Sequence, residues 1–276
     1  MIFSKIKKHF SLLLIRLIEK RTIHNMLAEN DQCLNDIVSS LMQLKSGRYE
    51  SEDILAFNRC EAYRKSLLNN HTLISYEVFG QNKSMQVSEI CRQATSKSIW
   101  AQFLYLITKK NQSPYFLEVG TNLGVSGSYI LEALKSKSDS NFITMEGLSQ
   151  LCQIANEQFF KISSSQKYTI IEGLYATTFP ELFRKKINFN ILFIDGNHRK
   201  DATLKYFNNL KSHLKLPAVL IFDDINWSDE MKQVWKIIKS DSDVSYSIDM
   251  FKLGVIIINK KTNKFKAKHY YLHLAY

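Results

Sequence analysis

The sequence predicts an α/β fold, in which a doubly wound sheet of seven strands, mostly parallel with one antiparallel strand, follows a helical N-terminal region. From residue 114 onward, short apolar segments alternate with segments of helical period, which is typical of a parallel sheet covered on both faces. Residues 244–251 and 253–261 are strand-like with no room for a helix between them, so they predict an antiparallel pair. Before residue 110, apolar residues keep helical spacing and breakers are few.

The first 24 residues predict an amphipathic helix, because Lys and Arg lie beside Leu, Ile and Phe. The apolar run FSLLLI is short, Arg16 interrupts the segment, and no small-residue cleavage site follows. A membrane span needs about 20 apolar residues. Two interpretations stay open: the helix docks on the protein's own body, or it makes peripheral contact with an anionic membrane surface. In either case we expect a cytoplasmic protein.

Residues 25–110 are expected to be mostly helical, with the clearest helical stretch at 88–110. Residues 72–80 are apolar and β-branched enough for a strand or an extended loop. No chemistry-bearing cluster is visible here, so we expect residues 1–110 to form a helical cap or oligomerisation element, and the protein to be a homo-oligomer. Residues 111–276 then form the second domain.

The remaining elements alternate along the chain. Strands are expected at residues 115–120, 141–147, 167–173, 189–195 and 218–224. Helices are expected at residues 126–136, 148–162, 180–186, 201–213 and 228–239.

The net charge of +11 is concentrated at the two ends of the chain. Residues 1–24 and residues 260–276 each carry +5, which leaves +1 for everything between them. A nucleic-acid-binding protein would place basic residues along a groove or on a reader motif, and neither is visible, so a nucleic-acid substrate is not favoured. The four cysteines are scattered without metal-binding spacing, which favours reduced thiols in a cytoplasmic protein.

A glycine-bearing loop follows the first strand of the second domain. The strand carries Glu118, the loop runs from Gly120 to Gly124, and a helical segment follows it. Such a turn commonly holds a nucleotide-like ligand. The dinucleotide fingerprint G-x-G-x-x-G does not fit this loop. Glu146 ends the next strand, where a carboxylate could accept hydrogen bonds from the two hydroxyls of a ribose. An adenosine with a ribose diol but without a pyrophosphate indicates S-adenosylmethionine.

Acidic residues that are candidates for a site lie at the ends of the predicted parallel strands. They are Glu118, Glu146, Asp195 and the pair Asp223 and Asp224. Ligands of open parallel sheets bind beyond the carboxyl ends of the strands, so these acids are candidates for a site. Helix capping would explain one or two of them.

Taken together, these motifs resemble those of the class I S-adenosylmethionine-dependent methyltransferases. The similarity lies in the run EVGTNLG at 118–124, MEG at 145–147, IDGNH at 194–198 and FDDINW at 222–227. A bacterial group within the family carries IDGNH and FDDI-W at these places, and the resemblance covers roughly residues 70–275. One departure is Asn122, which replaces the middle glycine of the usual loop; Asn is the non-glycine residue that best tolerates left-handed geometry.

The resemblance implies a Rossmann-like fold, a methyltransferase domain over residues 111–276 and bound S-adenosylmethionine. The residues that it places at the cofactor are Glu118, Gly120, Thr121, Asn122, Gly124, Ser126, Glu146, Gly147 and Asp195.

Methyl transfer to a hydroxyl requires alignment of the acceptor and removal of its proton. Asp195, Asp223 and Asp224, with Asn226 close by, offer hard oxygen ligands suited to Mg²⁺ or another divalent cation. Metal-dependent small-molecule O-methyltransferases place two or three acids in this way, and the sequence is similar to them there. Alternatively, Asp223 caps the next helix and Asp195 orders the cofactor.

His198 lies three residues after Asp195, so both side chains can face one cavity, with His198 and Asp195 as catalytic residues. Alternatively, His198 orders its loop. Trp227 and Tyr175 could wall the pocket or belong to the core. The favoured function is O-methylation of a small-molecule hydroxyl. A catalytically silent protein with the same fold and a nucleotide-dependent oxidoreductase remain as alternatives.

Overall fold

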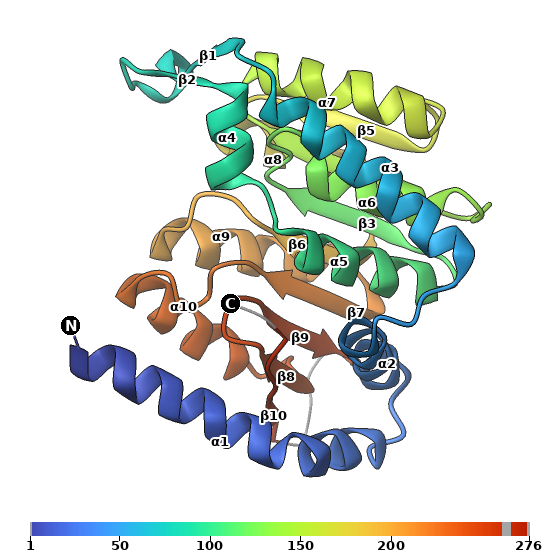
Figure 1. Ribbon diagram of the computed structural model, residues 1–276, viewed down its shortest axis with the longest axis vertical. Helices are drawn as coiled ribbons and strands as arrows, with labels where there is room; N and C mark the ends of the chain where they lie inside the picture. Colours follow the sequence, from blue (N-terminus) through green and yellow to red (C-terminus); the bar gives the residue numbers. More distant parts are fainter. Residues whose placement is uncertain (1, 261–265, 275–276) are drawn as a thin grey trace. The chain divides into compact units, whose positions relative to one another are not determined.

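A computed structural model describes residues 2–260 and 266–274, with side chains from Leu12 onward (Figure 1). The chain forms two compact units, residues 46–191 and residues 1–45 with 192–276. Each unit is an α/β assembly built on strands of an eight-stranded sheet. Strand β6 (Phe189–Ile194) contributes residues to both units.

The unit of residues 46–191 has the strand order β6-β3-β4-β5. Strands β3 (Tyr115–Val119), β4 (Asn141–Glu146) and β5 (Tyr168–Glu172) are parallel. A separate small hairpin pairs β1 (Leu73–Ser75) with β2 (Ser84–Gln86), and the short 3-10 helix η1 (Glu77–Phe79) lies between them. The α-helices are α3 (Ser51–Leu68), α4 (Val87–Ala94), α5 (Ser98–Lys110), α6 (Val125–Leu134), α7 (Ser149–Ile162) and α8 (Tyr175–Arg184).

A chain of aromatic rings fills the core of this unit. Phe116, Phe142, Phe159 and Tyr168 meet edge to face in succession, with ring centroids 5.9, 5.9 and 5.4 Å apart. Edge-to-face contacts of this kind add to the stabilisation that apolar burial provides. Gly127 on α6 lets the Phe159 ring approach the helix, because a Cβ at that position would lie 2.4 Å from Phe159 Cζ. The helix that follows the glycine loop is therefore fixed against α7 and β4.

The other unit has the strand order β10-β8-β9-β7-β6. Its strands are β7 (Leu214–Phe222), β8 (Tyr246–Asp249), β9 (Gly254–Ile258) and β10 (Lys268–Tyr271). Strand β9 is antiparallel to both β7 and β8, which confirms the predicted reversed strand. The helices are α1 (Ile2–Leu27), α2 (Gln32–Ser46), α9 (Lys200–Leu210), the 3-10 helix η2 (Lys211–His213) and α10 (Asp229–Lys239).

Strand β10 was not predicted, because its four residues come from a short basic segment. It pairs in parallel with β8 and also contacts α1. The Lys268 ammonium lies 2.6 Å from the Glu29 carboxylate at the end of α1, and the Tyr270 hydroxyl donates to the same carboxylate. These contacts hold α1 on its own unit, in agreement with the docking interpretation. Two residues of the basic C-terminal segment, Lys261 and Lys264, lie outside the described residues.

The strands and helices predicted after residue 114 are confirmed. Three differences from the prediction concern one helical stretch before that residue and the first residues of α8 and β7. The helical stretch at 88–110 is two helices, because Thr95–Lys97 are extended and the Arg64 guanidinium binds Thr95 Oγ1 and Ser96 O there. Helix α8 begins at Tyr175, so Pro180 lies inside it. Strand β7 begins at Leu214, four residues earlier than predicted. The predicted domain boundary between residues 110 and 111 stays a prediction.

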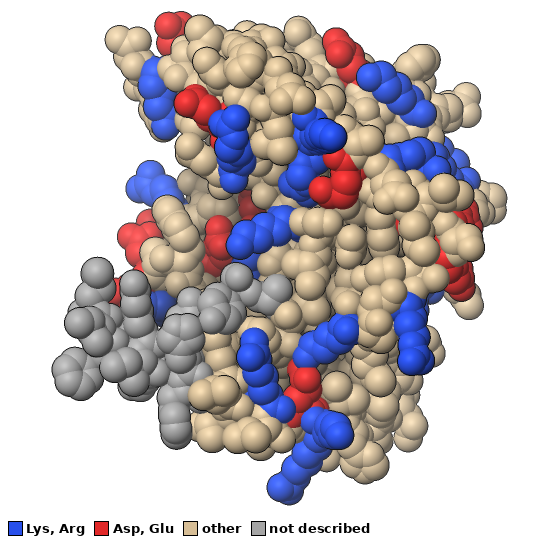
Figure 2. Space-filling model, in the orientation of Figure 1, with Lys and Arg blue, Asp and Glu red and all other residues tan. Residues whose placement is uncertain are grey.

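Two further sequence expectations concern charge and membranes. Figure 2 shows Lys and Arg side chains interspersed with Asp and Glu on the face it draws, in line with the small net charge between the two ends. Among the helices of the described residues, none has the length and apolar character that crossing a bilayer requires.

Candidate active site

The glycine loop connects β3 to α6 and is fixed to the neighbouring strand. The backbone amides of Gly120 and Thr121 both donate to Met145 O, each at 3.1 Å. Gly124 has a φ of +73°, and a Cβ there would lie 2.8 Å from Ala155 Cβ, so only glycine fits. Asn122 also adopts left-handed geometry, with a φ of +49°. The departure from glycine is thus accommodated by the conformation that Asn tolerates best.

Glu118 lies under this loop and is fully buried. Its carboxylate accepts hydrogen bonds from Ser126 Oγ at 2.5 Å and from Thr144 Oγ1 at 2.7 Å. The Thr144 hydroxyl also meets Thr121 Oγ1 at 2.6 Å. Burial raises the pKa of Glu118 to about 7, against the two hydroxyl donors, which favour the charged form. In this arrangement Glu118, Thr121 and Ser126 tie the strand, the loop and α6 together, and their predicted cofactor contacts stay predictions.

Glu146 ends β4, and its carboxylate accepts hydrogen bonds from three backbone amides, one of which belongs to the glycine loop. Its Oε2 accepts from the Asn122 amide at 2.9 Å, and its Oε1 accepts from the Gly147 and Leu148 amides at 2.7 and 3.0 Å. Burial nevertheless raises the pKa of this carboxyl above its ordinary value. A carboxylate has about four acceptor positions, so these bonds leave about one for a ligand hydroxyl. A single bond to a ribose hydroxyl fits this geometry better than the predicted grip on two.

Two apolar residues that the sequence analysis missed lie beside Glu146. A Cβ on Gly147 would lie 2.7 Å from the Phe79 ring and 3.8 Å from Leu174 Cδ2. Both Phe79 and Leu174 are 43% exposed, so they form an open apolar surface next to a buried carboxylate. Gln150 at the start of α7 holds the β1 strand, because its side chain bonds the Ser75 amide and Leu73 O. The apolar run at 72–80 was the only sequence signal for this surface.

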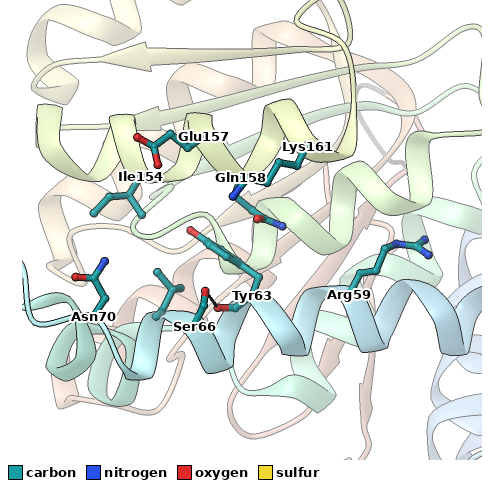
Figure 3. A pocket seen from close by; sticks show the side chains of 9 residues that line it. Arg59, Tyr63, Ser66, Asn70, Ile154, Glu157, Gln158 and Lys161 are labelled. Carbon is teal, nitrogen blue, oxygen red and sulfur yellow. Dashed lines mark hydrogen bonds between the residues drawn. The ribbon is translucent and has the colours of Figure 1, made fainter.

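A cleft of about 310 Å³ lies between α3 and α7 in the same unit (Figure 3). Its polar lining carries charges of both signs, on Arg59, Lys161 and Glu157. Tyr63 on α3 lies at this cleft and donates from its hydroxyl to Leu123 O of the glycine loop at 2.6 Å. No residue predicted at the cofactor lines the cleft, so it is distinct from the predicted site.

The second group of predicted residues lies in the other unit, around the carboxyl ends of β6 and β7. Asp223 lies beside Asp195, because the Asp223 backbone amide donates to Ile194 O at 3.0 Å. Burial, then the neighbouring Asp223 carboxylate, raises the pKa of Asp195 well above its ordinary range. The Lys252 ammonium lies 2.8 Å from Asp223 Oδ1 and 2.8 Å from Asp224 Oδ1. The structure brings the three acids into one group, together with a lysine that the sequence analysis did not name.

His198 reaches the same group of acids. Its Nε2 lies 3.5 Å from Asp195 Oδ1, so the structure brings the two predicted catalytic residues together. The indole of Trp227 is 5.9 Å from the imidazole, centroid to centroid, and is 69% exposed, so Trp227 is not a core residue. Tyr175 instead packs against Phe179 within α8. The side-chain amide of Asn226 donates to Phe251 O at 2.8 Å, so this side chain contacts the turn between β8 and β9.

The acids do not fit a divalent cation in this arrangement. A metal needs the carboxylate oxygens of Asp223 and Asp224, and the Lys252 ammonium is already bound to them. Among the described residues, no group of three His, Cys, Asp or Glu side chains has a geometry that could hold a metal ion. The glycine loop and this acid group belong to different units.

Comparison with known proteins supports the fold. Residues 117–225 match the model of a methyltransferase domain. This stretch contains the glycine loop, Glu146, His198 and all three aspartates. No curated protein matches the sequence significantly.

Several solved structures share the architecture at low sequence identity. The O-methyltransferase TomG from Streptomyces achromogenes, in complex with SAM, is 18% identical with a TM-score of 0.52, over 60% of this chain and 82% of its own. The O-methyltransferase from Bacillus cereus, in complex with SAH, is 18% identical with a TM-score of 0.54, over 71% and 91%. The SAH-bound Podospora anserina methyltransferase PaMTH1 is 16% identical with a TM-score of 0.53, over 78% and 97%. The predicted Rossmann-like fold is confirmed, because the chain shares the α/β fold of these methyltransferase structures.

Proposed function

We propose that this chain is an S-adenosylmethionine-dependent methyltransferase that methylates a hydroxyl group of a small molecule. The observation that carries the proposal is the glycine loop, which Met145 O and the Glu146 carboxylate hold by three backbone hydrogen bonds inside the stretch that matches a methyltransferase domain. The structures with the same fold include O-methyltransferases described as complexes with SAM or SAH. The hydroxyl acceptor is proposed from those likenesses and from the candidate base described below.

The cofactor side of the proposal rests on residues of one unit. The free acceptor position of the Glu146 carboxylate would bind one ribose hydroxyl. Phe79 and Leu174, which lie around Gly147, offer an apolar surface of the kind that an adenine ring covers. The loop amides between Gly120 and Gly124 are fixed by Met145 O and by Glu146, so the loop is organised before a ligand binds.

Proton removal rests on His198 and Asp195. When bound, S-adenosylmethionine supplies a methyl group activated by its sulfonium, so the chain itself has only to align the acceptor and take its proton. His198 Nε2 faces Asp195 Oδ1. An imidazole that donates from Nε2 to this oxygen leaves Nδ1 as the base, and Asp195 then fixes the tautomer. The 3.5 Å separation exceeds the hydrogen-bond reach of about 3.2 Å, and catalytic contacts of this kind often shorten only when substrate binds.

The predicted assistance by a divalent metal is not built into this mechanism. Asp195, Asp223 and Asp224 would be its ligands, but Lys252 already binds two of them. The proposed proton removal therefore does not involve a metal ion. The expected homo-oligomer and cytoplasmic location play no part in the chemistry and stay predictions.

Calorimetric titration of the purified protein with S-adenosylmethionine, S-adenosylhomocysteine and NADH tests the proposal. We expect binding of the first two and none of NADH. Isotopically labelled S-adenosylmethionine incubated with cell extract, followed by mass spectrometry, should then reveal a labelled small molecule. Cofactor binding without any methylated product would favour the silent protein with the same fold. Binding of NADH alone would favour an oxidoreductase and contradict the proposal.

A further inference from the structure

Lys252 is aimed at the acid group by a rigid turn between β8 and β9. The Lys252 amide donates to Met250 O at 2.9 Å, the Met250 amide donates to Leu253 O at 2.9 Å, and the Ile225 amide donates to Lys252 O at 3.2 Å. Behind the turn, a Cβ on Gly254 would lie 2.7 Å from the Trp235 ring, so the start of β9 is packed closely against α10. The backbone of Lys252 is thus held in place by hydrogen bonds and packing, and its ammonium reaches Asp223 and Asp224 from there.

The ammonium uses the oxygens that a metal would use. Lys252 Nζ lies 2.8 and 2.9 Å from the two oxygens of Asp223, and 2.8 Å from Asp224 Oδ1. Asp223 is only 6% exposed in its side chain, and Lys252 is 23% exposed. A divalent cation could bind here only by displacing a partly buried ammonium and leaving it without its two carboxylates, which is costly.

We propose that Lys252 is the resident cation of this site and takes the place of a divalent metal. It holds the Asp223 and Asp224 carboxylates in position, while the Asp223 amide donates to Ile194 O, next to Asp195, and Asp195 faces His198. Lys252 is thus a positioning residue for the candidate base. The assignment of this network to an active site rests on the proposed function, but the exclusion of a metal does not.

Manganese binding tests this proposal without an activity assay. Electron paramagnetic resonance of Mn²⁺ added to the metal-free protein should show no bound ion in the wild type at millimolar metal. Lys252→Met should create a site that binds Mn²⁺, since Asp223 and Asp224 then lose their cation and can turn, with the neighbouring Asp195, toward a metal ion. A matched control is Lys211→Met, because Lys211 is equally exposed at 23% and bridges Asp241 and Asp243 at 2.8 and 2.6 Å. Binding to the Lys252 variant should be at least ~10-fold tighter, from the larger ligand charge.

Each outcome decides the proposal. One Mn²⁺ bound by the wild type and lost in Asp223→Asn would overturn it, and this measurement holds even where Lys252→Met does not fold. A folded Lys252→Met protein that gains no more Mn²⁺ binding than the Lys211 control would also overturn it. S-adenosylmethionine binding, measured separately with EDTA present, tests the proposed function, so the two failures are distinguishable.

A second inference comes from an independent feature, the exposed face of α1. Leu13, Leu14, Leu17 and Ile18 are between 46% and 79% exposed. Residues at i, i+1, i+4 and i+5 lie on one side of a helix, so the four side chains form one apolar stripe. Exposed basic residues follow it at Lys20 and Arg21. The acid in this segment, Glu19, forms an ion pair with Lys45.

We propose that this stripe lies on an anionic lipid surface. The segment of residues 1–24 carries a net charge of +5, which matches an anionic membrane and opposes the pairing of two such helices from two copies. Leu and Ile would enter the boundary between headgroups and acyl chains, while Lys and Arg would stay among the headgroups. The expected contact is peripheral, in line with the amphipathic helix predicted from the sequence.

Sedimentation with vesicles tests the surface. The full-length protein should bind vesicles of phosphatidylglycerol and phosphatidylcholine, bind pure phosphatidylcholine far less, and lose binding at high salt. Leu13→Gln with Leu17→Gln should reduce binding at least ~10-fold, since each buried apolar side chain contributes on the order of 1.5–3 kcal/mol. Phe160→Gln is the control, because Phe160 is 71% exposed but lies on α7. Equal sedimentation of both variants would overturn the proposal, as would a dimer in size-exclusion chromatography that the double variant abolishes.

Discussion

Two groups of carboxylates are held in opposite ways in this protein. Glu118 and Glu146, at the ends of β3 and β4, accept hydrogen bonds from hydroxyls and backbone amides, none of which carries a charge. Asp223 and Asp224, after β7, are held by the Lys252 ammonium. Neutral donors leave the pKa of both glutamates raised, and burial is the main cause. The first group therefore suits an uncharged hydroxyl ligand, whereas the second concentrates charge where a proton would be moved.

The largest expected effect is on the reaction rate and concerns His198, which lies beside the aspartate group. His198→Ala should lower kcat by roughly 10²–10⁴-fold, the range for loss of a general base, with S-adenosylmethionine affinity nearly unchanged. Steady-state kinetics on the identified acceptor and calorimetry with the cofactor measure the two quantities. His213→Ala, on η2, is a control for loss of a histidine. A fall in cofactor affinity that equals the fall in rate would break the proposed division of roles.

Removal of the lysine should destabilise the protein more than removal of a comparable lysine elsewhere. Lys252→Met is expected to lower the free energy of unfolding by about 3 kcal/mol, because it leaves Asp223 buried and unpaired. Lys211→Met should cost about 1 kcal/mol, since its partner Asp241 is 22% exposed against 6% for Asp223. Urea unfolding at neutral pH measures both. Equal losses would show that the Lys252 pair is not the more buried one in solution.

The stability of the protein should depend on pH through Glu118, one of the two glutamates that uncharged donors hold. Its pKa is raised to about 7 in the folded state, so the folded protein holds this proton more tightly than the unfolded chain, whose value is about 4.3. The associated stability is present below the unfolded pKa and is lost as the pH rises to about 7. Glu118→Gln keeps a neutral side chain at all pH values. The stability of the wild type relative to this variant should fall by on the order of 2–3 kcal/mol between pH 4.5 and 7.5. If urea unfolding shows that this difference in stability stays constant over the pH range, the prediction is contradicted.

The smallest expected effect concerns the bond to the cofactor. Glu146→Ala should weaken S-adenosylmethionine binding at least ~10-fold, through loss of a charge-assisted hydrogen bond and of the loop contacts. Glu172→Ala is a matched control, because Glu172 is the register partner of Glu146 on β5 and its side chain is exposed. Calorimetry should show the control unchanged. Unchanged affinity in the Glu146 variant would remove this carboxylate from the cofactor site.

Much of the fold was predictable because its signals are local. Strands and helices after residue 114 follow from apolar runs and helical periods, and β9 is reversed because no helix fits before it. Two other features of the fold have no local signal, because they depend on contacts between residues far apart in the sequence. The break at Thr95–Lys97 depends on Arg64, and β10 depends on Glu29 at the far end of the chain.

The candidate site divides in the same way. The sequence alone determined that acids follow the parallel strands and that His198 is three residues from Asp195, because both are matters of spacing. The structure alone decided that Phe79 covers Gly147 and that Lys252, 28 residues after Asp224, binds its carboxylate. Periodicity encodes which face of an element is buried, but it does not encode which distant turn is folded against that element's end. The sequence therefore could not predict that Lys252 takes the place of a metal, because this depends on the pairing of β9 with β7 and β8.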